Sequence, residues 1–270
     1  MKKLSYLAKT IDDEIVKDGL CAISTLESTI QNKNLISVVG GMAVQSYLHK
    51  DYRRPTSDID ILVGRPLNDV DFRDFSKPLK EYLQDKGYEI HKGKTSGAHK
   101  LLVYNPKTED KMAVEFSRKN IKNFEKHEKH IERELENSRK KIVEDRFKTY
   151  TVIAPEDLVL PKLTRSINTL KRREDLAKKM DLVMEGYSHK TLKDILKLRE
   201  EAMFNLGNTR IAEELRFFSD LYDMKILSEL VGYNEDYLNT ASNDWETLKE
   251  DASQKQILLA ILPKLNLSFR

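Results

Sequence analysis

The chain of 270 residues contains a single cysteine, Cys21. One cysteine cannot form a disulfide within the chain, and it excludes a zinc site built from several cysteines. Chains without disulfides are typical of the reducing cytoplasm, so we expect a cytoplasmic protein.

Long apolar runs are also missing from the sequence. A membrane-spanning helix needs roughly 20 consecutive apolar residues, and no stretch approaches that length. Near the N-terminus, Lys2 and Lys3 are followed by no apolar run, because Lys9 and the acidic residues 12–14 interrupt it. We therefore expect neither a signal segment nor a membrane partner.

Neither sign of charge dominates the sequence. The 47 basic and 44 acidic residues leave a net charge of +3, which does not by itself require a nucleic-acid partner. Hydrophobic residues make up 39% of the chain, enough for one large core or two smaller ones. This balance excludes a disordered chain.

The first half of the sequence alternates between helical and strand patterns. Apolar spacing predicts a helix over residues 4–31, with a break at Gly19. A β-rich run at 35–39 then leads through Gly40-Gly41 into a helix over 42–48. The remaining predictions are a helix over 69–86, kinked or restarted at Pro78, and strands over 58–63, 88–91, 100–104 and 111–116.

The second half has few strand signals. The charged residues 118–148 fit either a helix or a long loop, and from Pro155 the sequence becomes rich in Leu, Lys and Glu. This composition predicts a bundle of about four to six helices. We expect an α+β protein with two domains, residues 1–155 and 156–270.

Two aspartates define the strongest candidate site. Asp58 and Asp60 are two residues apart on a predicted strand, so their carboxylates point to the same side. Two neighbouring anions repel each other unless a cation lies between them. Mg²⁺ prefers such oxygen ligands together with substrate phosphates, so the pair predicts a metal–nucleotide site.

A third carboxylate and a glycine turn extend this site. Glu115 is the one acidic residue in a later apolar strand and could complete a two-metal cluster or accept a proton. Gly40-Gly41 would let phosphate approach the backbone at the start of a helix. Each feature alone has an ordinary structural explanation, and their order within one α/β segment is the more specific signal.

The motifs Gly40-Gly41-Met42-Ala43 and Arg54-Pro55-Thr56-Ser57-Asp58-Ile59-Asp60-Ile61 resemble the signature of the polymerase-beta nucleotidyltransferase superfamily. The resemblance is closest to the AbiEii-type family, which includes toxins of type IV toxin–antitoxin systems. It implies a nucleotidyltransferase-like mixed sheet flanked by helices, followed by a C-terminal helical bundle. It also implies binding of a nucleoside triphosphate and two Mg²⁺ ions. The implied metal ligands are Asp58, Asp60 and Glu115, and the implied nucleotide-binding residues are Gly40, Gly41, Arg54, Thr56 and Ser57.

The same resemblance implies two further catalytic residues. Lys162 would bind triphosphate oxygens, although Pro161 before it predicts a kink or restart in the helix. The alternative is a solvent-facing lysine on an amphipathic helix. Asp181 is the favoured family aspartate, with Asp175 in reserve.

A nucleotidyltransferase passes a nucleoside monophosphate to an acceptor, and the sequence specifies that acceptor less well than the nucleotide site. A basic run over 162–179 would suit the phosphates of RNA, such as tRNA, although charge runs are often only solvated helix faces. Three hypotheses follow: transfer of a nucleoside monophosphate to RNA, with an antitoxin protein as partner; transfer to a protein or small molecule; or a non-catalytic nucleotide-binding module. The three carboxylates together argue against the last.

Overall fold

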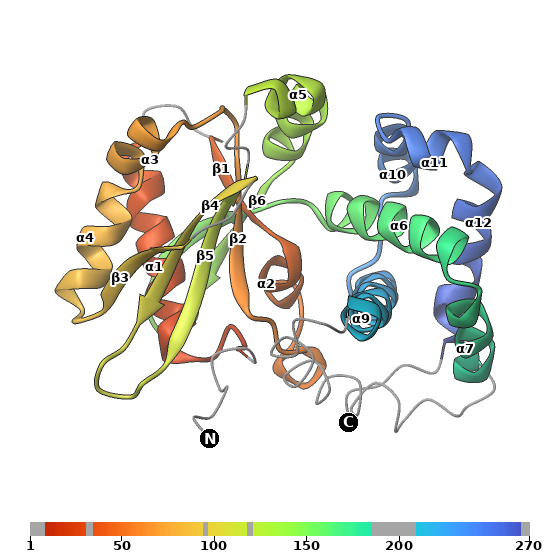
Figure 1. Cartoon of the computed structure of the whole chain (residues 1–270), viewed down its shortest axis with the longest axis horizontal. Coiled ribbons are helices and arrows are strands. Elements are labelled where there is room, and N and C mark those ends of the chain that lie inside the picture. Colours follow the sequence, from red (N-terminus) through yellow and green to blue (C-terminus); the bar gives the residue numbers. More distant parts are fainter. Residues whose placement is uncertain (1–8, 31–34, 94–96, 118–120, 185–208, 266–270) are drawn as a thin grey trace. The chain divides into compact units, whose positions relative to one another are not determined.

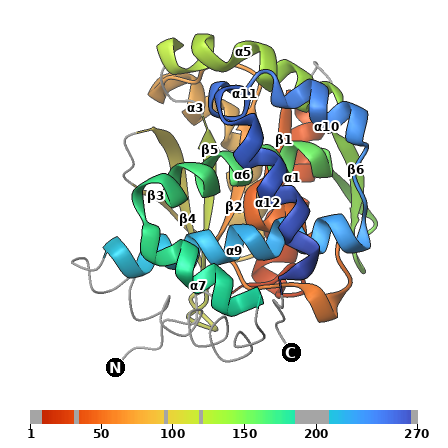
Figure 2. The same ribbon diagram turned by 90° about the vertical axis from the view of Figure 1, so that its right-hand side faces the viewer.

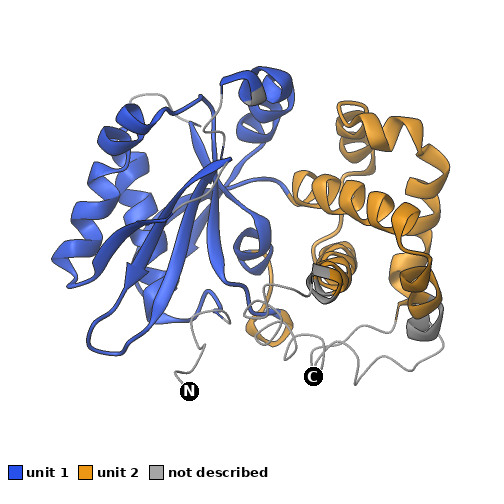
Figure 3. Cartoon of the chain, viewed as in Figure 1, with its two compact units in different colours: residues 1–46, 53–154 blue, residues 47–52, 155–270 orange. Residues whose placement is uncertain are grey.

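The computed structural model describes residues 9–30, 35–93, 97–117, 121–184 and 209–265. The chain divides into two compact units (Figure 3). The first comprises Met1–Ser46 and Arg53–Ala154, and the second comprises Tyr47–Tyr52 and Pro155–Arg270.

The first unit is built on a mixed sheet (Figure 1). In spatial order, its seven described strands are β3 (Glu89–Gly93), β4 (Ala98–Tyr104), β5 (Lys111–Ser117), β2 (Asp58–Val63), β1 (Ile36–Val39), β7 (Lys148–Val152) and β6 (Arg139–Val143). The β2–β5 and β1–β7 pairs are parallel, and the other neighbours are antiparallel. The predicted mixed sheet is therefore confirmed.

Strand β2 lies at the centre of the sheet and has two unlike faces. Ile59, Ile61 and Val63 are completely buried, whereas Asp58 and Asp60 are partly exposed. The alternation has period two, so the apolar side chains enter the core and both aspartates lie on the opposite face.

Helices cover both faces of this sheet (Figure 1). α1 (Glu14–Thr29) and α4 (Lys77–Asp85) pack together on one face, and α2 (Gly40–Gln45) lies on the other. The predicted restart near Pro78 is confirmed, because α3 (Asp69–Phe75) ends at Ser76 and α4 has Pro78 in its first turn. Proline is tolerated there, where its missing N–H has no helical acceptor to lose.

The predicted helix break at Gly19 is wrong. α1 runs without interruption from Glu14 to Thr29, with Gly19 buried in its middle. A Cβ atom at position 19 would lie 2.6 Å from Met112 Cε and 3.0 Å from Ile59 Cδ1. The glycine therefore allows the helix to approach the sheet closely rather than ending the helix.

Residues 118–148 hold more structure than the sequence indicated. The helical alternative is confirmed by α5 (Ile121–Glu136), but β6 and the start of β7 also fall in this stretch and were not predicted. β6 is an edge strand carrying Arg139, Lys140 and Lys141, and charged edge strands lack the apolar alternation that reveals a strand.

The described part of the second unit is helical, as predicted. It contains α6 (Pro155–Arg172), α7 (Glu174–Met184), α9 (Thr209–Leu230), α10 (Glu235–Ser242), α11 (Glu246–Glu250), α12 (Ala252–Ile261) and the 3-10 turns η2 (Lys50–Tyr52) and η3 (Leu262–Lys264). Within this unit, α6 packs against both α9 and α12, and α12 crosses α6 in the view of Figure 2. Pro161 lies inside α6, which does not restart there.

Among the described residues, no helix has both the length and the apolar character needed to cross a bilayer.

The close approach at Gly19 can be tested with a large side chain. Gly19→Leu should destabilise the protein by about 1–3 kcal/mol, because the added atoms must displace Met112 and Ile59. Ser28→Leu, on the exposed side of the same helix, is the control and should change the free energy of unfolding by less than about 0.5 kcal/mol. Urea denaturation measures both, and equal effects would contradict the packing argument.

Candidate active site

The strand register brings the predicted site residues of the first unit together. Asp60 pairs with Val39 of β1 on one side and with Glu115 of β5 on the other. Directly paired residues point to the same face of a sheet, so Glu115 lies beside Asp60. The glycine turn begins directly after Val39, next to the same aspartate.

The turn at Gly40-Gly41 is shaped around these carboxylates. Gly40 has a φ of +73°, a conformation that costs glycine little but strains other residues. A Cβ atom at position 40 would overlap Oδ2 of Asp60. At position 41 it would lie 3.0 Å from Oγ1 of Thr56 and 3.2 Å from Nη2 of Arg54. Gly40 therefore makes room for Asp60, and Gly41 makes room for Thr56 and Arg54.

The residues before β2 support the aspartates. Thr56 is buried, and its hydroxyl donates a hydrogen bond of 3.3 Å to Oδ1 of Asp58. Arg54 is also buried and donates from Nη1 to the carbonyl of Pro55 at 3.2 Å, while Ser57 is partly buried. Nucleotide binding by these residues stays a prediction. Side-chain atoms of Arg54 and Thr56 lie where a side chain at position 41 would begin.

Gln45 is a supporting residue that the sequence reasoning missed. Its side chain is buried and accepts a hydrogen bond from the Ile11 N–H at 2.9 Å. Its amide donates to the carbonyl of Arg54 at 2.9 Å and to that of Lys9 at 3.3 Å. A polar residue at the end of the apolar run Met42-Ala43-Val44 is the signal that could have marked it.

Lys100 is the other residue that sequence reasoning missed. It pairs directly with Glu115 across β4 and β5, and its ammonium forms an ion pair with the Glu115 carboxylate. About a quarter of each side chain is exposed. The sequence gives only a lysine in an otherwise apolar strand, and its partner becomes visible only through the strand register.

The donor set fits a magnesium ion held by two aspartates and substrate phosphates. Mg²⁺ commonly uses one or two protein carboxylates and takes its other ligands from phosphate and water. Asp58 and Asp60 supply such oxygens from one face of β2. Within the described residues, however, no three His, Cys, Asp or Glu side chains are grouped as a metal cage. Glu115 forms an ion pair with Lys100 through Oε1, so Lys100 would compete with a metal ion for this carboxylate.

Lys162 belongs to the second unit, where it is buried rather than facing solvent as the alternative expected. Its ammonium donates to Oδ2 of Asp223 at 2.8 Å and to Oδ1 of Asp220 at 3.3 Å. Arg165 completes the cluster with two bonds of 3.0 Å to Asp220. A triphosphate role for Lys162 stays a prediction, and here the lysine joins α6 to α9.

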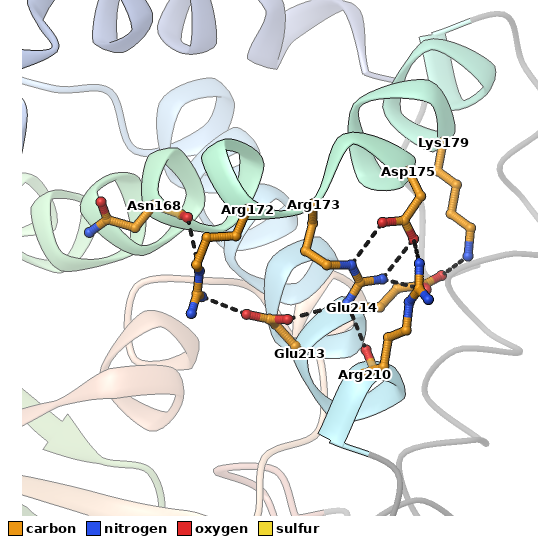
Figure 4. A network of polar contacts seen from close by, with 8 residues as sticks. All are labelled: Asn168, Arg172, Arg173, Asp175, Lys179, Arg210, Glu213 and Glu214. Atoms are coloured by element: carbon orange, nitrogen blue, oxygen red, sulfur yellow. Dashed lines mark hydrogen bonds and ion pairs between the residues drawn. The ribbon is translucent and has the colours of Figure 1, made fainter.

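The two candidate family aspartates both lie in α7. Asp175 accepts hydrogen bonds from Arg173 at 2.7 and 2.8 Å and lies 3.2 Å from Arg210 (Figure 4). The Arg173 guanidinium, with help from Arg210, holds the pKa of the Asp175 carboxyl well below its usual range. Asp181 lies near the C-terminal end of the same helix, three residues before Met184. A catalytic role for either aspartate stays a prediction.

Comparison with known proteins gives little further support. No protein-family model matches the chain, and no curated protein matches it. Among solved structures, the chain is similar to an antigenic nucleotidyltransferase-like protein from Paracoccidioides brasiliensis. The identity is 11% and the TM-score is 0.39, with 89% of this chain and 92% of the other covered. At that TM-score the similarity does not establish a function for the chain.

The first site prediction concerns Gly40. Gly40→Ala should lower the thermal midpoint and should also displace Asp60, because the new Cβ overlaps its carboxylate. Gly87→Ala is a matched control, since Gly87 also has positive φ, +87°, but no atom lies within 4 Å of its added Cβ. Both variants should lose stability, and only Gly40→Ala should weaken Mg²⁺-dependent nucleotide binding in calorimetry. Equal binding by the two variants would contradict the proposed contact.

The second site prediction concerns the Lys100–Glu115 pair. If Glu115 is a metal ligand, Lys100 competes with the metal, and Lys100→Gln should tighten Mg²⁺ binding about two- to fivefold. The measurement is the Mg²⁺ concentration that half-saturates the rise in thermal midpoint. Lys92 is the control, because it is an exposed lysine of the same sheet that forms an ion pair with Asp69 of α3. Lys92→Gln should leave that Mg²⁺ concentration unchanged. An unchanged Mg²⁺ concentration for Lys100→Gln as well would show that Glu115 is not a metal ligand.

Proposed function

We propose that the protein transfers a nucleoside monophosphate from a nucleoside triphosphate to an acceptor hydroxyl, with Mg²⁺ as cofactor. The observation that supports this most strongly is the shared position of three sequence elements. Asp60 lies against Gly40 and is paired in register with Glu115, and Asp58 shares its strand face.

The residues have separable roles in this proposal. Asp58 and Asp60 would hold the metal, which supplies charge neutralisation to the triphosphate and to the leaving pyrophosphate. The glycine turn would keep Asp60 in position for the metal, because Gly40 has no side chain where the Asp60 carboxylate lies. Thr56 keeps Asp58 oriented through its hydrogen bond.

The reaction balances with Glu115 as base. The acceptor hydroxyl oxygen forms a bond to the α-phosphorus, and the bond between the α-phosphorus and the bridging oxygen to the β-phosphate breaks. Pyrophosphate leaves with that electron pair, and the hydroxyl proton passes to Glu115. The Lys100 ammonium contacts Oε1 of Glu115, so the other carboxylate oxygen, Oε2, would accept the proton.

We further propose RNA, with tRNA as the first choice, as the acceptor, and an AbiEii-type toxin role with an antitoxin protein as partner. The support is the motif resemblance from Gly40 to Ile61 together with the basic run over residues 162–179. Transfer to a protein or small-molecule hydroxyl uses the same first-unit residues and differs only in the acceptor.

One observation favours a second candidate function, non-catalytic nucleotide binding. The Glu115 carboxylate forms an ion pair with Lys100, and the described residues show no group of three metal-ligating side chains. Nucleotide binding alone does not require Glu115 as a base. The two candidate functions differ in whether a nucleoside monophosphate is transferred from the bound nucleotide to an acceptor.

The proposal is tested by incubating the protein with each of four α-labelled nucleoside triphosphates, Mg²⁺, total RNA and total protein. Label should appear on RNA, and Asp60→Asn should reduce transfer roughly a hundredfold or more, because the variant loses a metal-binding charge. Asp74→Asn is the control, since Asp74 is exposed in α3 and should retain full activity.

The outcomes separate the candidates. Label on protein alone would replace RNA as the acceptor, and transfer by Asp60→Asn at the wild-type rate would refute the metal-site assignment. Nucleotide binding without transfer to any acceptor would favour the binding module. Circular dichroism of both variants must show an unchanged fold.

A further inference from the structure

The second unit contains a pocket of about 1010 Å³ between α6 and α9. Two acidic residues, Glu213 and Asp220, contribute to its lining. Six basic residues also line it, namely Arg165, Lys171, Arg172, Arg173, Arg210 and Arg216. The six basic and two acidic residues give the lining a net charge of +4, which favours an anionic ligand.

Helical spacing explains why these side chains converge. On α6, Arg165, Thr169 and Arg172 follow one another at intervals of four and three residues, so they share a face of the helix. On α9, Glu213, Phe217 and Asp220 repeat the same intervals. The two faces oppose each other because α6 packs against α9 along this stretch.

Ion pairs hold most of the cations in place. Arg172 and Arg173 both contact Glu213, at 2.6 and 3.2 Å, and Arg173 also binds Asp175 (Figure 4). Arg165 binds Asp220, Lys171 lies 2.5 Å from Asp251, and Arg210 lies 3.2 Å from Asp175. These pairs orient the guanidinium groups, because planar Arg–carboxylate contacts fix both partners.

Arg216 differs from the other cations of the pocket. It is exposed, and the described residues offer it no carboxylate within ion-pair distance. Its five N–H donors are therefore available to a ligand, and guanidinium geometry suits phosphate oxygens.

Ser166 provides an independent indication of a ligand. Its side chain is only 1% exposed, and it forms part of the pocket lining on α6. The buried Oγ has no hydrogen-bond partner within the described structure. A buried hydroxyl without a partner is unfavourable, and a helical serine usually satisfies it by bonding to the preceding turn. An anion in the pocket would accept this hydrogen bond.

We propose that this pocket binds closely spaced phosphate groups, with Arg216 as the available cation and Ser166 as a buried donor. The volume lies at the upper end of ligand-binding pockets, so it accommodates more than one phosphate. This chemistry is shared by the polyphosphate of a nucleotide and the phosphodiester backbone of RNA. An RNA ligand here would be the proposed acceptor and rests on the proposed function, whereas a polyphosphate ligand goes beyond that function.

The experiment measures binding of two probes to the full chain in EDTA: inorganic tripolyphosphate by calorimetry and a labelled single-stranded RNA by fluorescence anisotropy. Arg216→Glu should weaken binding by roughly tenfold or more, because it reverses the available charge. Ser166→Ala should weaken it about threefold without lowering the thermal midpoint, because the lost hydroxyl had no partner in the protein.

Two controls match these variants. Lys264→Glu reverses an exposed charge of the same unit outside the pocket, and Ser219→Ala removes a buried hydroxyl of α9 outside it. Neither should change affinity more than about twofold. Asp60→Asn should bind both probes like the wild type, which separates failure of this site from failure of the first-unit site.

Each outcome bears on the proposal. Tripolyphosphate binding that depends on Arg216 and Ser166 supports the pocket and identifies a polyphosphate ligand, and RNA binding with the same dependence supports it and identifies a phosphodiester ligand. Absence of binding by both probes would overturn the proposal. Affinities for Arg216→Glu and Ser166→Ala equal to those of their controls would also overturn it.

Discussion

The candidate site depends on one constraint, the fixed alternation of β2. Ile59 and Ile61 are completely buried on one face, so a shift of one residue would move them to the aspartate face and place both carboxylates in the core. The cost of such a shift fixes the register. With β2 fixed, its two neighbours bring Gly40 and Glu115 beside Asp60. Packing on the apolar face therefore positions the chemistry on the polar face.

The second unit uses charge differently. Lys162 and Asp223 are buried together, and such a pair persists only where each charge has a partner. Nearer the surface, the same two helices present arginines in excess of carboxylates around a pocket. Along α6 and α9, buried ion pairs thus join the helices, and the excess positive charge is left for a ligand.

The sequence predicted the elements whose signals are local, and it failed where the deciding contact is distant. The strand at 58–63 and the break near Pro78 follow from alternation and from proline geometry. The break predicted at Gly19 is wrong because glycine permits both a break and close packing. Only the distant residues Met112 and Ile59 distinguish the two. The aspartate pair and the glycine turn were likewise visible locally. Lys100 and the partners of Lys162 were not, because strand register and helix packing bring them together.

The central claim is that Asp58 and Asp60 together hold a divalent cation. Its most direct test is an electron paramagnetic resonance titration of Mn²⁺ with a non-hydrolysable nucleoside triphosphate analogue. The wild type is compared with the double variant Asp58→Asn/Asp60→Asn, which keeps the side-chain shapes and removes both charges. Protein-bound Mn²⁺ in the wild type that disappears in the folded double variant is the predicted result. Equal Mn²⁺ binding by the two proteins would contradict the account.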